Sequence, residues 1–145
     1  MDQEFTVEFQ NLNVNPVKPK RDRNKERMIK LENEEAATRY LKWMGYEIEA
    51  RNWKCSAGEA HIVAREGDTI VFVEVEGASI DEGFPPEMLT PAKRSKWEAI
   101  AIAFLKEYTS EDLCIRFDFI GIISLDEEKK LIKHHVNTFG VMRDE

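Results

Sequence analysis

The sequence predicts one α/β domain with a mixed central sheet flanked by helices. With 145 residues, the chain is long enough for a single domain with a substantial core and too short for two. Helix-like and strand-like periodicities follow one another in the order helix, three strands, helix, strand, strand. The strand at Thr69–Glu76 is apolar on both faces, which is typical of a central strand covered by helices on both sides of the sheet.

The first helix is predicted over Asn24–Met44, and Gly45 is a natural helix terminator. Its small and apolar residues recur every three or four positions, so they share one face that we expect to be buried. This face consists of Asn33, Ala36, Ala37, Tyr40, Leu41 and Met44.

Three strands follow, over Tyr46–Ala50, Glu59–Arg65 and Thr69–Glu76. The first alternates apolar and polar residues, as a half-buried strand does. The second and third are joined by Gly67-Asp68, a two-residue connection typical of a tight hairpin. Trp53 is interpreted as a core residue, with stacking on a nucleic-acid base as the alternative.

The second helix begins at Thr90-Pro91, a hydroxyl cap followed by proline at the first helical position. Two closing strands are predicted over Leu113–Ile123 and Leu131–Val136. The buried stripe of the helix is expected to consist of Trp97, Ile100, Ala101, Phe104, Leu105 and Tyr108. His134 and His135 point to opposite faces of the last strand and are interpreted as incidental rather than as metal ligands.

The composition excludes several classes of protein. Charged residues make up 34% and hydrophobic residues 42% of the chain, a balance typical of a globular protein rather than a disordered one. The longest apolar run, Ala99–Leu105, is too short to cross a membrane, and Met1–Glu4 does not begin a secretory signal. We therefore expect a cytoplasmic protein without membrane contact, with Cys55 and Cys114 as reduced thiols.

The net charge of −7, from 21 basic and 28 acidic residues, excludes a protein that coats DNA through bulk positive charge. Residues 1–29 are predicted to be a leader with a basic arm, and residues 30–145 a single folded domain. Asparagine and proline interrupt the leader, although Phe5–Phe9 alternates like a short strand.

The basic arm, residues 18–30, has seven basic side chains and two acidic ones. Lys20, Arg21 and Arg23 in this arm are candidates for contacts with nucleic-acid phosphates. The alternative is that the arm is a solvated helix start.

Four polar residues are expected to cluster at one end of the central hairpin. If Gly67-Asp68 is the turn, His61 lies opposite Glu74 and Glu59 lies opposite Glu76. Carboxylates at the end of a buried strand are unfavourable unless a cation, a proton or a hydrogen-bond network compensates their charge, so a divalent metal site is one interpretation. The alternative is that these strand ends lie in water, and a one-residue slip in register would remove the cluster.

A set of short motifs resembles the YraN family of small bacterial proteins in order and spacing. The resemblance implies a restriction-endonuclease-like fold that carries the PD-(D/E)XK nuclease site, and it covers about residues 30–124. The motifs are Asn33–Leu41, Gly45-Tyr46, Ala50–Trp53, Gly58–Ala64, Val71–Val75, Thr90–Lys93 and Arg116–Asp118.

Four acidic residues coincide with acidic positions of that family. Glu34 corresponds to the glutamate of the first helix, and Glu59 to the glutamate of the Gly-Glu-Ile-Asp strand. Glu74 corresponds to the metal-binding glutamate of the Glu-Val-Lys strand, and Asp118 to the late aspartate. The resemblance therefore implies Glu74, Glu59, Glu34 and Glu76 as catalytic residues and Glu74, Glu59 and His61 as ligands of Mg²⁺ or Mn²⁺.

The sequence departs from the family at positions that carry the catalytic site. His61 replaces the aspartate, Glu76 replaces the lysine, and Gly77-Ala78 replaces a Thr-Arg pair. Imidazole suits Mg²⁺ poorly, and glutamate puts a negative charge where lysine would meet the phosphate. Lys93 and Arg94, at the start of the second helix, could supply the missing cation or contact nucleic acid, unless they are simply solvated.

We therefore interpret the protein as a nucleic-acid-related, restriction-endonuclease-like protein with an impaired metal-dependent phosphodiesterase site. One alternative is an active divalent-metal-dependent endonuclease that uses Glu76 in place of lysine. Another is a protein-interaction module that retains only the scaffold. The expected partners are nucleic acid and, in a homodimer, a second copy of the chain.

Overall fold

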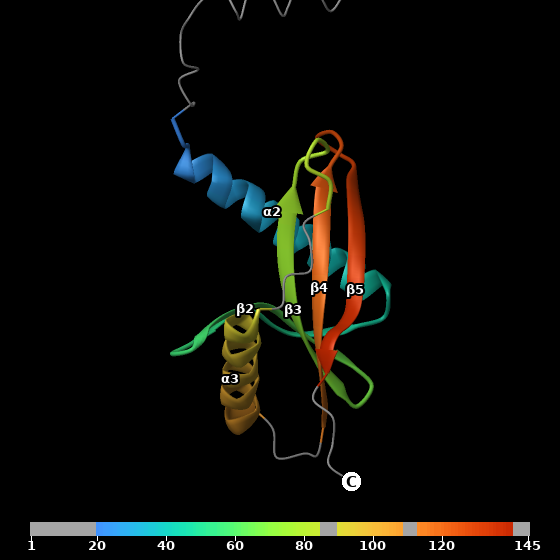
Figure 1. Ribbon diagram of the computed structural model, residues 1–145. Coiled ribbons are helices and arrows are strands. Elements are labelled where there is room, and N and C mark those ends of the chain that lie inside the picture. The colour runs from blue at the N-terminus through green and yellow to red at the C-terminus, as the bar shows by residue number, and fades with distance from the viewer. Residues whose placement is uncertain (1–19, 85–89, 109–112, 141–145) are drawn as a thin grey trace, which may run out of the picture.

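A computed structural model of the protein describes residues 20–84, 90–108 and 113–140, with side chains described up to residue 136. The strand expected at Phe5–Phe9 lies outside the described residues. The elements, drawn in Figure 1, are α2 (Arg23–Trp43), β1 (Glu47–Cys55), β2 (Gly58–Glu66), β3 (Thr69–Ala78), α3 (Pro91–Tyr108), β4 (Cys114–Ser124) and β5 (Lys130–Gly140). Their order is the predicted one, and their bounds extend the predicted strands at most ends.

The five strands form one mixed sheet in the order β1-β2-β3-β4-β5. β1, β2 and β3 are antiparallel neighbours joined by short turns. α3 then carries the chain across the sheet so that β4 pairs parallel to β3, and β5 returns antiparallel to β4. A parallel pair requires a long crossover, which is why a helix stands at this point of the sequence. This mixed sheet with flanking helices agrees with a restriction-endonuclease-like fold.

The two helices cover opposite faces of the sheet, so the central strand β3 is buried on both sides (Figure 1). On one face, Ala37 and Leu41 of α2 pack against alternate residues of β2, β3 and β4. On the other face, the apolar stripe of α3 packs on Phe72 and its neighbours. The residues of this stripe that are buried are Trp97, Ile100, Ala101 and Phe104.

α2 begins and ends where its caps dictate. The Asp22 side chain accepts hydrogen bonds from the amides of Asn24 and Lys25, both at 3.1 Å, and so satisfies the first free N–H groups of the helix. Gly45, with φ at +95°, reverses the chain after the last turn. Met44 was expected to be buried but is 51% exposed, because it caps the helix beyond the edge of the covered sheet.

The basic arm is helical from residue 23 onward and belongs to α2. The boundary drawn between residues 29 and 30 therefore falls inside this helix. Every residue from 20 to 32 is exposed, so the first turns of α2 project past the sheet (Figure 1). In the described residues, no helix is long and apolar enough to cross a membrane.

The last turn of α3 is exposed from residue 106 to residue 108. Tyr108 was expected to be buried but is 57% exposed. Trp53 packs edge-on against Phe104, with ring centroids 5.3 Å apart, so its contacts are those of the core interpretation. Cys55 and Cys114 are both free.

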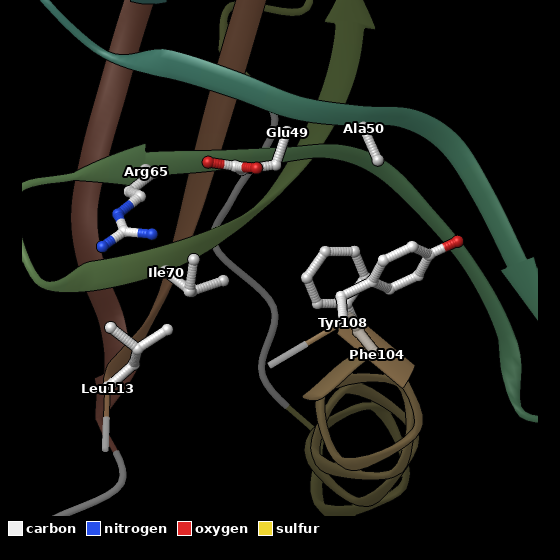
Figure 2. Close-up of a pocket in the computed structure, with 7 residues that line it drawn as sticks. All are labelled: Glu49, Ala50, Arg65, Ile70, Phe104, Tyr108 and Leu113. Atoms are coloured by element: carbon white, nitrogen blue, oxygen red, sulfur yellow. The ribbon is translucent and has the colours of Figure 1, made fainter. Parts of the chain in front are cut away.

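A pocket of about 230 Å³ lies beside the last turns of α3. Figure 2 shows Phe104 and Tyr108 projecting from the helix toward the strands that carry Glu49 and Arg65. Lys93, at the start of the same helix, is at the other end of α3, and none of the predicted site residues lines this pocket.

Candidate active site

The hairpin of β2 and β3 has the predicted register, but it is shorter than predicted. Five pairs form, from Glu66↔Thr69 to Ile62↔Val73. Beyond Ile62, β2 pairs with β1 alone, so the direct pairs expected between His61 and Glu74 and between Glu59 and Glu76 do not form. The expectation failed because turn chemistry fixes the register of a hairpin but not the point where two twisting strands separate.

His61 takes over a backbone interaction at the point where the strands separate. Its Nδ1 accepts a hydrogen bond from the Val75 amide at 2.9 Å, an amide that lies just beyond the last β2–β3 pair. Burial lowers the pKa of His61, and the nearby ammonium groups of Lys30 and Lys96 lower it further, against the opposing effect of Glu59. A neutral imidazole with Nδ1 occupied by a main-chain amide has only Nε2 left for a ligand.

Glu74 is half-buried on β3, and Glu76 two residues later is exposed. Burial raises the pKa of Glu74, and the charge of Glu76 raises it further. Lys93 and Lys96 of α3 act in the opposite direction. Two cations from the helix therefore accompany a carboxylate pair on the strand.

Lys96 is a site residue that sequence reasoning missed. Its side chain crosses Gly58, where a Cβ atom would lie 2.5 Å from Lys96 Cε and 3.4 Å from Lys96 Nζ. Arg94, chosen from the sequence instead, forms an ion pair with Glu98 at 3.2 Å along the exposed side of the helix. The available signal was helical spacing, since Lys96 is one turn after Lys93 and shares its face.

Glu34 lies deep between α2 and β1, with only 1% of its surface exposed. Its Oε2 accepts a hydrogen bond from Asn52 Nδ2 at 3.0 Å. Burial raises the pKa of Glu34, and Glu59 adds to the rise, whereas Lys30 and Arg51 oppose it. A buried carboxylate with a raised pKa is typical of a functional site.

Asn52 is the second residue that sequence reasoning missed. Its φ of +51° is the single positive value among the described residues other than glycine, and its Oδ1 is buried without a hydrogen-bond partner. Strained backbone and an unsatisfied polar atom both mark positions kept for a reason other than local stability. Only its place in the Ala50–Trp53 motif could have drawn attention to it.

The departure at Gly77 has a packing reason. A Cβ atom at Gly77 would clash with Asn33 Nδ2, so glycine allows α2 to approach β3 closely here. The Asn33 side chain also accepts a hydrogen bond from Lys130 Nζ at 2.7 Å, which ties the helix to β5.

The residues implied as metal ligands do not fit a preformed Mg²⁺ centre. Among the described residues, no three His, Cys, Asp or Glu side chains are arranged to hold a metal ion. The charge of Glu59 raises the pKa of Glu34, and the charge of Glu76 raises the pKa of Glu74. His61, between them in the chain, is engaged with the main chain. Mg²⁺ needs several converging oxygen ligands, which this arrangement does not offer.

The basic arm reaches the same region. Lys20, Arg21 and Arg23 are all exposed, and Arg21 is paired with Glu26 at 2.7 Å. Lys30, at the end of the arm, lies close enough to His61 for its charge to lower the pKa of the imidazole.

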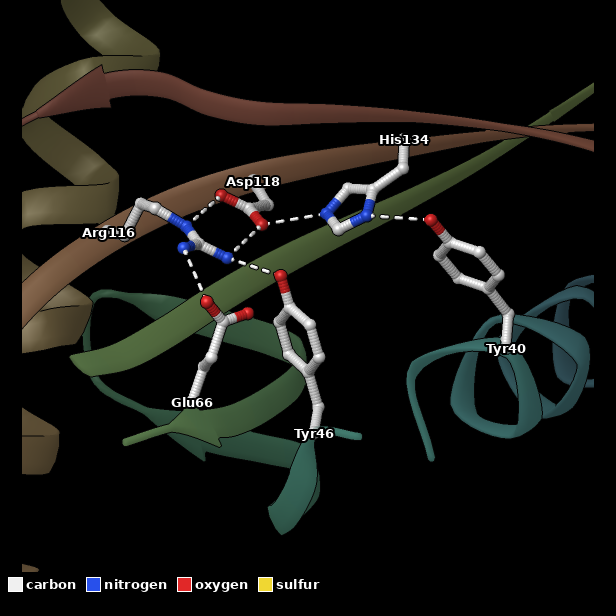
Figure 3. Close-up of polar contacts among 6 residues, drawn as sticks. All are labelled: Tyr40, Tyr46, Glu66, Arg116, Asp118 and His134. Carbon is white, nitrogen blue, oxygen red and sulfur yellow. Dashed lines mark hydrogen bonds and ion pairs between the residues drawn. The ribbon is translucent and has the colours of Figure 1, made fainter. Parts of the chain in front are cut away.

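Asp118 belongs to a different cluster, on the α2 face of β4. Its side chain is fully buried and receives two hydrogen bonds from Arg116, at 2.9 and 3.0 Å. The guanidinium also donates to the Tyr46 hydroxyl at 2.6 Å and lies 3.8 Å from Glu66 (Figure 3). Desolvation opposes the charge of Arg116, yet the hydrogen bond and charge of Asp118 outweigh it and raise the pKa of Arg116.

His134 extends this network across the sheet to α2. Its Nε2 lies 2.7 Å from Asp118 Oδ2 and its Nδ1 lies 3.0 Å from the Tyr40 hydroxyl (Figure 3). His134 and His135 do point to opposite faces, since His135 contacts the ring of Phe119 instead. His134 has a structural role that the sequence did not predict, because the fold brings it to a buried carboxylate that is distant in sequence.

Comparison with known proteins supports the resemblance found in the motifs. The sequence pattern of the uncharacterised protein family UPF0102 matches residues 33–122. A UPF0102 protein of Caldicellulosiruptor saccharolyticus is 41% identical over 90 residues, covering 61% of this chain and 76% of the relative. One of Kosmotoga olearia is 43% identical over 97 residues, covering 66% and 83%. One of Geobacter sulfurreducens is 36% identical over 114 residues, covering 78% and 89%. The matched region contains Glu34, Asn52, His61, Glu74 and Lys96.

Proposed function

Because this chain belongs to the uncharacterised protein family UPF0102, the YraN family, we propose that it binds nucleic acid through a restriction-endonuclease-like domain whose metal-dependent phosphodiesterase centre is impaired. The observation that carries the proposal is that exposed basic side chains from two helices lie close enough to His61 for their charges to act on it. Lys30 of α2 and Lys96 of α3 both lower the pKa of this histidine. Rows of lysine and arginine side chains bind the phosphate backbone of nucleic acids.

The basic arm continues this line of charge away from the sheet. It is exposed along its described length, from residue 20 to residue 30, so its charged ends are available to a ligand. The remainder of the chain has a net negative charge, and like charges repel phosphate, so we expect nucleic acid to bind at the basic arm. A localised basic surface on an acidic protein supports a restricted contact rather than general coating of DNA.

The impairment is supported by the donor set at the site. His61 stands where the family has aspartate and has committed Nδ1 to the Val75 amide. Glu76 stands where the family has the lysine that would stabilise charge on the phosphate. Both changes weaken a site for Mg²⁺ and a scissile phosphate, while the scaffold around them is retained.

Charge removal from the basic arm is expected to weaken DNA binding in a salt-dependent way. In the triple variant Lys20→Gln, Arg23→Gln, Arg27→Gln, the slope of log K against log salt concentration should fall by about 2 to 3. Fluorescence anisotropy with duplex, single-stranded and branched DNA measures this slope. Lys42→Gln, Lys106→Gln, Lys129→Gln is the matched control, because these exposed lysines lie outside the arm. Equal slopes for the two triple variants would contradict a role for the arm.

The same DNA substrates, incubated with Mg²⁺ or Mn²⁺, test the impairment. We expect no cleavage by the wild-type protein or by Glu74→Ala. Cleavage that disappears in Glu74→Ala would instead establish an active endonuclease that works with Glu76 in place of lysine. Absence of binding to every DNA would favour a protein-interaction module.

A further inference from the structure

We propose that the pocket beside the last turns of α3 binds a free α-amino acid with an aromatic or branched apolar side chain. In this assignment the Glu49 carboxylate accepts hydrogen bonds from the ligand ammonium group, and the Arg65 guanidinium donates to the ligand carboxylate. The rings of Phe104 and Tyr108 contact its side chain. The inference goes beyond the proposed function and does not depend on it, because the pocket is at the opposite end of α3 from Lys93.

A β-bulge brings Glu49 into the pocket. The pairing of β1 with β2 shifts between Ile48 and Ala50, which leaves Glu49 as an extra residue in β1. Successive strand residues normally point to opposite faces of a sheet, yet Glu49 and its neighbour Ala50 both line the pocket. Bulges that re-aim a side chain are common next to active sites. The local backbone therefore delivers a carboxylate to the face of the sheet that α3 covers.

Glu49 and Arg65 bring opposite charges to one pocket. Within the described residues, the Glu49 carboxylate has no hydrogen-bond or ion-pair partner, although it points toward the Arg65 guanidinium (Figure 2). Arg65 Nε donates a hydrogen bond to the Gly67 carbonyl at 2.9 Å. A guanidinium has several N–H donors in a planar fork, so this bond does not use up its capacity to bind a carboxylate. Opposite charges that both line the pocket match the two charges of a zwitterion.

Aromatic side chains form the apolar wall of the pocket (Figure 2). Phe104 is buried and Tyr108 is exposed, and their ring centroids lie 4.8 Å apart. Trp53 of β1 supports both rings, with its centroid 5.3 Å from that of Phe104 and 6.3 Å from that of Tyr108. Ile70 and Leu113 add further apolar surface. An apolar wall with a few polar groups is the usual composition of a small-molecule site.

The size of the pocket selects a small ligand. Its volume of about 230 Å³ is below the roughly 300 to 1,000 Å³ of sites that hold drug-sized molecules. A free amino acid combines an ammonium group, a carboxylate and an apolar group in a small frame. A nucleotide is larger and has no ammonium group for Glu49. Volume and charge therefore both favour an amino acid over a nucleotide in this pocket.

Isothermal titration calorimetry of the full chain at neutral pH, with L-phenylalanine and L-leucine as probes, tests the inference. Both amino acids should bind to the wild-type protein. Phenethylamine lacks the carboxylate and N-acetyl-L-phenylalanine lacks the ammonium group, so each loses one charged interaction. Each should bind about tenfold more weakly than L-phenylalanine, or not at all.

Matched variants assign the binding to this pocket. Glu49→Gln should weaken L-phenylalanine binding by about tenfold. Glu47→Gln should not, because Glu47 is an exposed glutamate of the same strand that does not line the pocket. Tyr108→Ala should also weaken binding, whereas Ile102→Ala, at another exposed apolar position of α3 away from the pocket lining, should not.

Three results would overturn the inference. The first is no heat of binding for either amino acid, and the second is equal affinity of the wild-type protein and Glu49→Gln for L-phenylalanine. The third is binding of phenethylamine as tight as that of L-phenylalanine, which would show that Arg65 does not hold the ligand carboxylate. None of these measurements involves DNA, so the proposed function is tested separately.

Discussion

Replacing Asp118 with alanine is expected to lower the free energy of unfolding by about 3 kcal/mol, because it leaves a buried guanidinium without its counter-ion. Arg116 has only 16% of its side chain exposed and donates two hydrogen bonds to Asp118. His134 loses its 2.7 Å partner in the same step. Unfolding in guanidinium chloride at neutral pH, followed by circular dichroism, measures the change in the free energy of unfolding.

Two further variants separate the effect of losing the charge from the effect of losing the side chain. Asp118→Asn should lower the free energy of unfolding less than Asp118→Ala does, since an amide oxygen still accepts one of the hydrogen bonds. Asp81→Ala, at an exposed position, should leave stability within about 0.5 kcal/mol of the wild type. A loss below about 1 kcal/mol in Asp118→Ala would mean that the network contributes little to stability.

Glu34→Gln is expected to stabilise the protein at neutral pH by about 1 kcal/mol, or roughly 4 °C in Tm for a domain of this size. The buried carboxylate carries a charge that burial disfavours, and glutamine removes that charge. The glutamine amide can also donate to Asn52 Oδ1, which is buried without a partner, while its oxygen still accepts from Asn52 Nδ2. One substitution therefore corrects two unfavourable features of the site.

The pH dependence of this effect has a definite sign. Burial raises the pKa of Glu34 above the 4.5 of an unperturbed glutamate, so the folded protein holds this proton more tightly than the unfolded chain. The contribution of Glu34 to stability is then fully present below pH 4.5 and is lost as pH rises through the raised pKa. The advantage of Glu34→Gln should accordingly be greatest at neutral pH and shrink as the pH falls toward 4.5.

Thermal unfolding between pH 4 and pH 8 provides the measurement. Glu32→Gln is the matched control, because Glu32 is an exposed glutamate on the same helix and its charge carries no burial penalty. Glu34→Ala should destabilise, since both polar groups of the Asn52 side chain would then lack a partner. A lower Tm for Glu34→Gln at neutral pH would show that the charge of Glu34 is itself stabilising.

The unfavourable burial of the Glu34 charge also bears on function. Glu34 is a buried acid whose pKa is raised further by the charge of Glu59, and it contacts Asn52, which has a positive φ. Residues that lower stability are commonly kept where the site needs their chemistry. We therefore expect Glu34→Gln to be more stable than the wild type and not better at binding DNA.

Local sequence patterns were enough to predict the helices and strands and much of their arrangement. Thr90-Pro91 fixed the start of α3, Gly45 fixed the end of α2, and the Gly67-Asp68 turn fixed the register of five hairpin pairs. Each of these depends on the conformational preferences of residues that are adjacent in the chain. Caps and turns depend on neighbouring residues alone, so these predictions from the sequence were confirmed.

The contacts between polar side chains depend instead on how the helices and strands pack together. His134 lies within hydrogen-bond distance of Tyr40, 94 residues away in the sequence, because its side chain and α2 are on the same face of the sheet. His61 turns to the Val75 amide because β2 and β3 separate at Ile62. Lys96 crosses Gly58 because α3 approaches β2 at that point. Strand divergence and helix approach are properties of the packed whole, and no local pattern of residues encodes them.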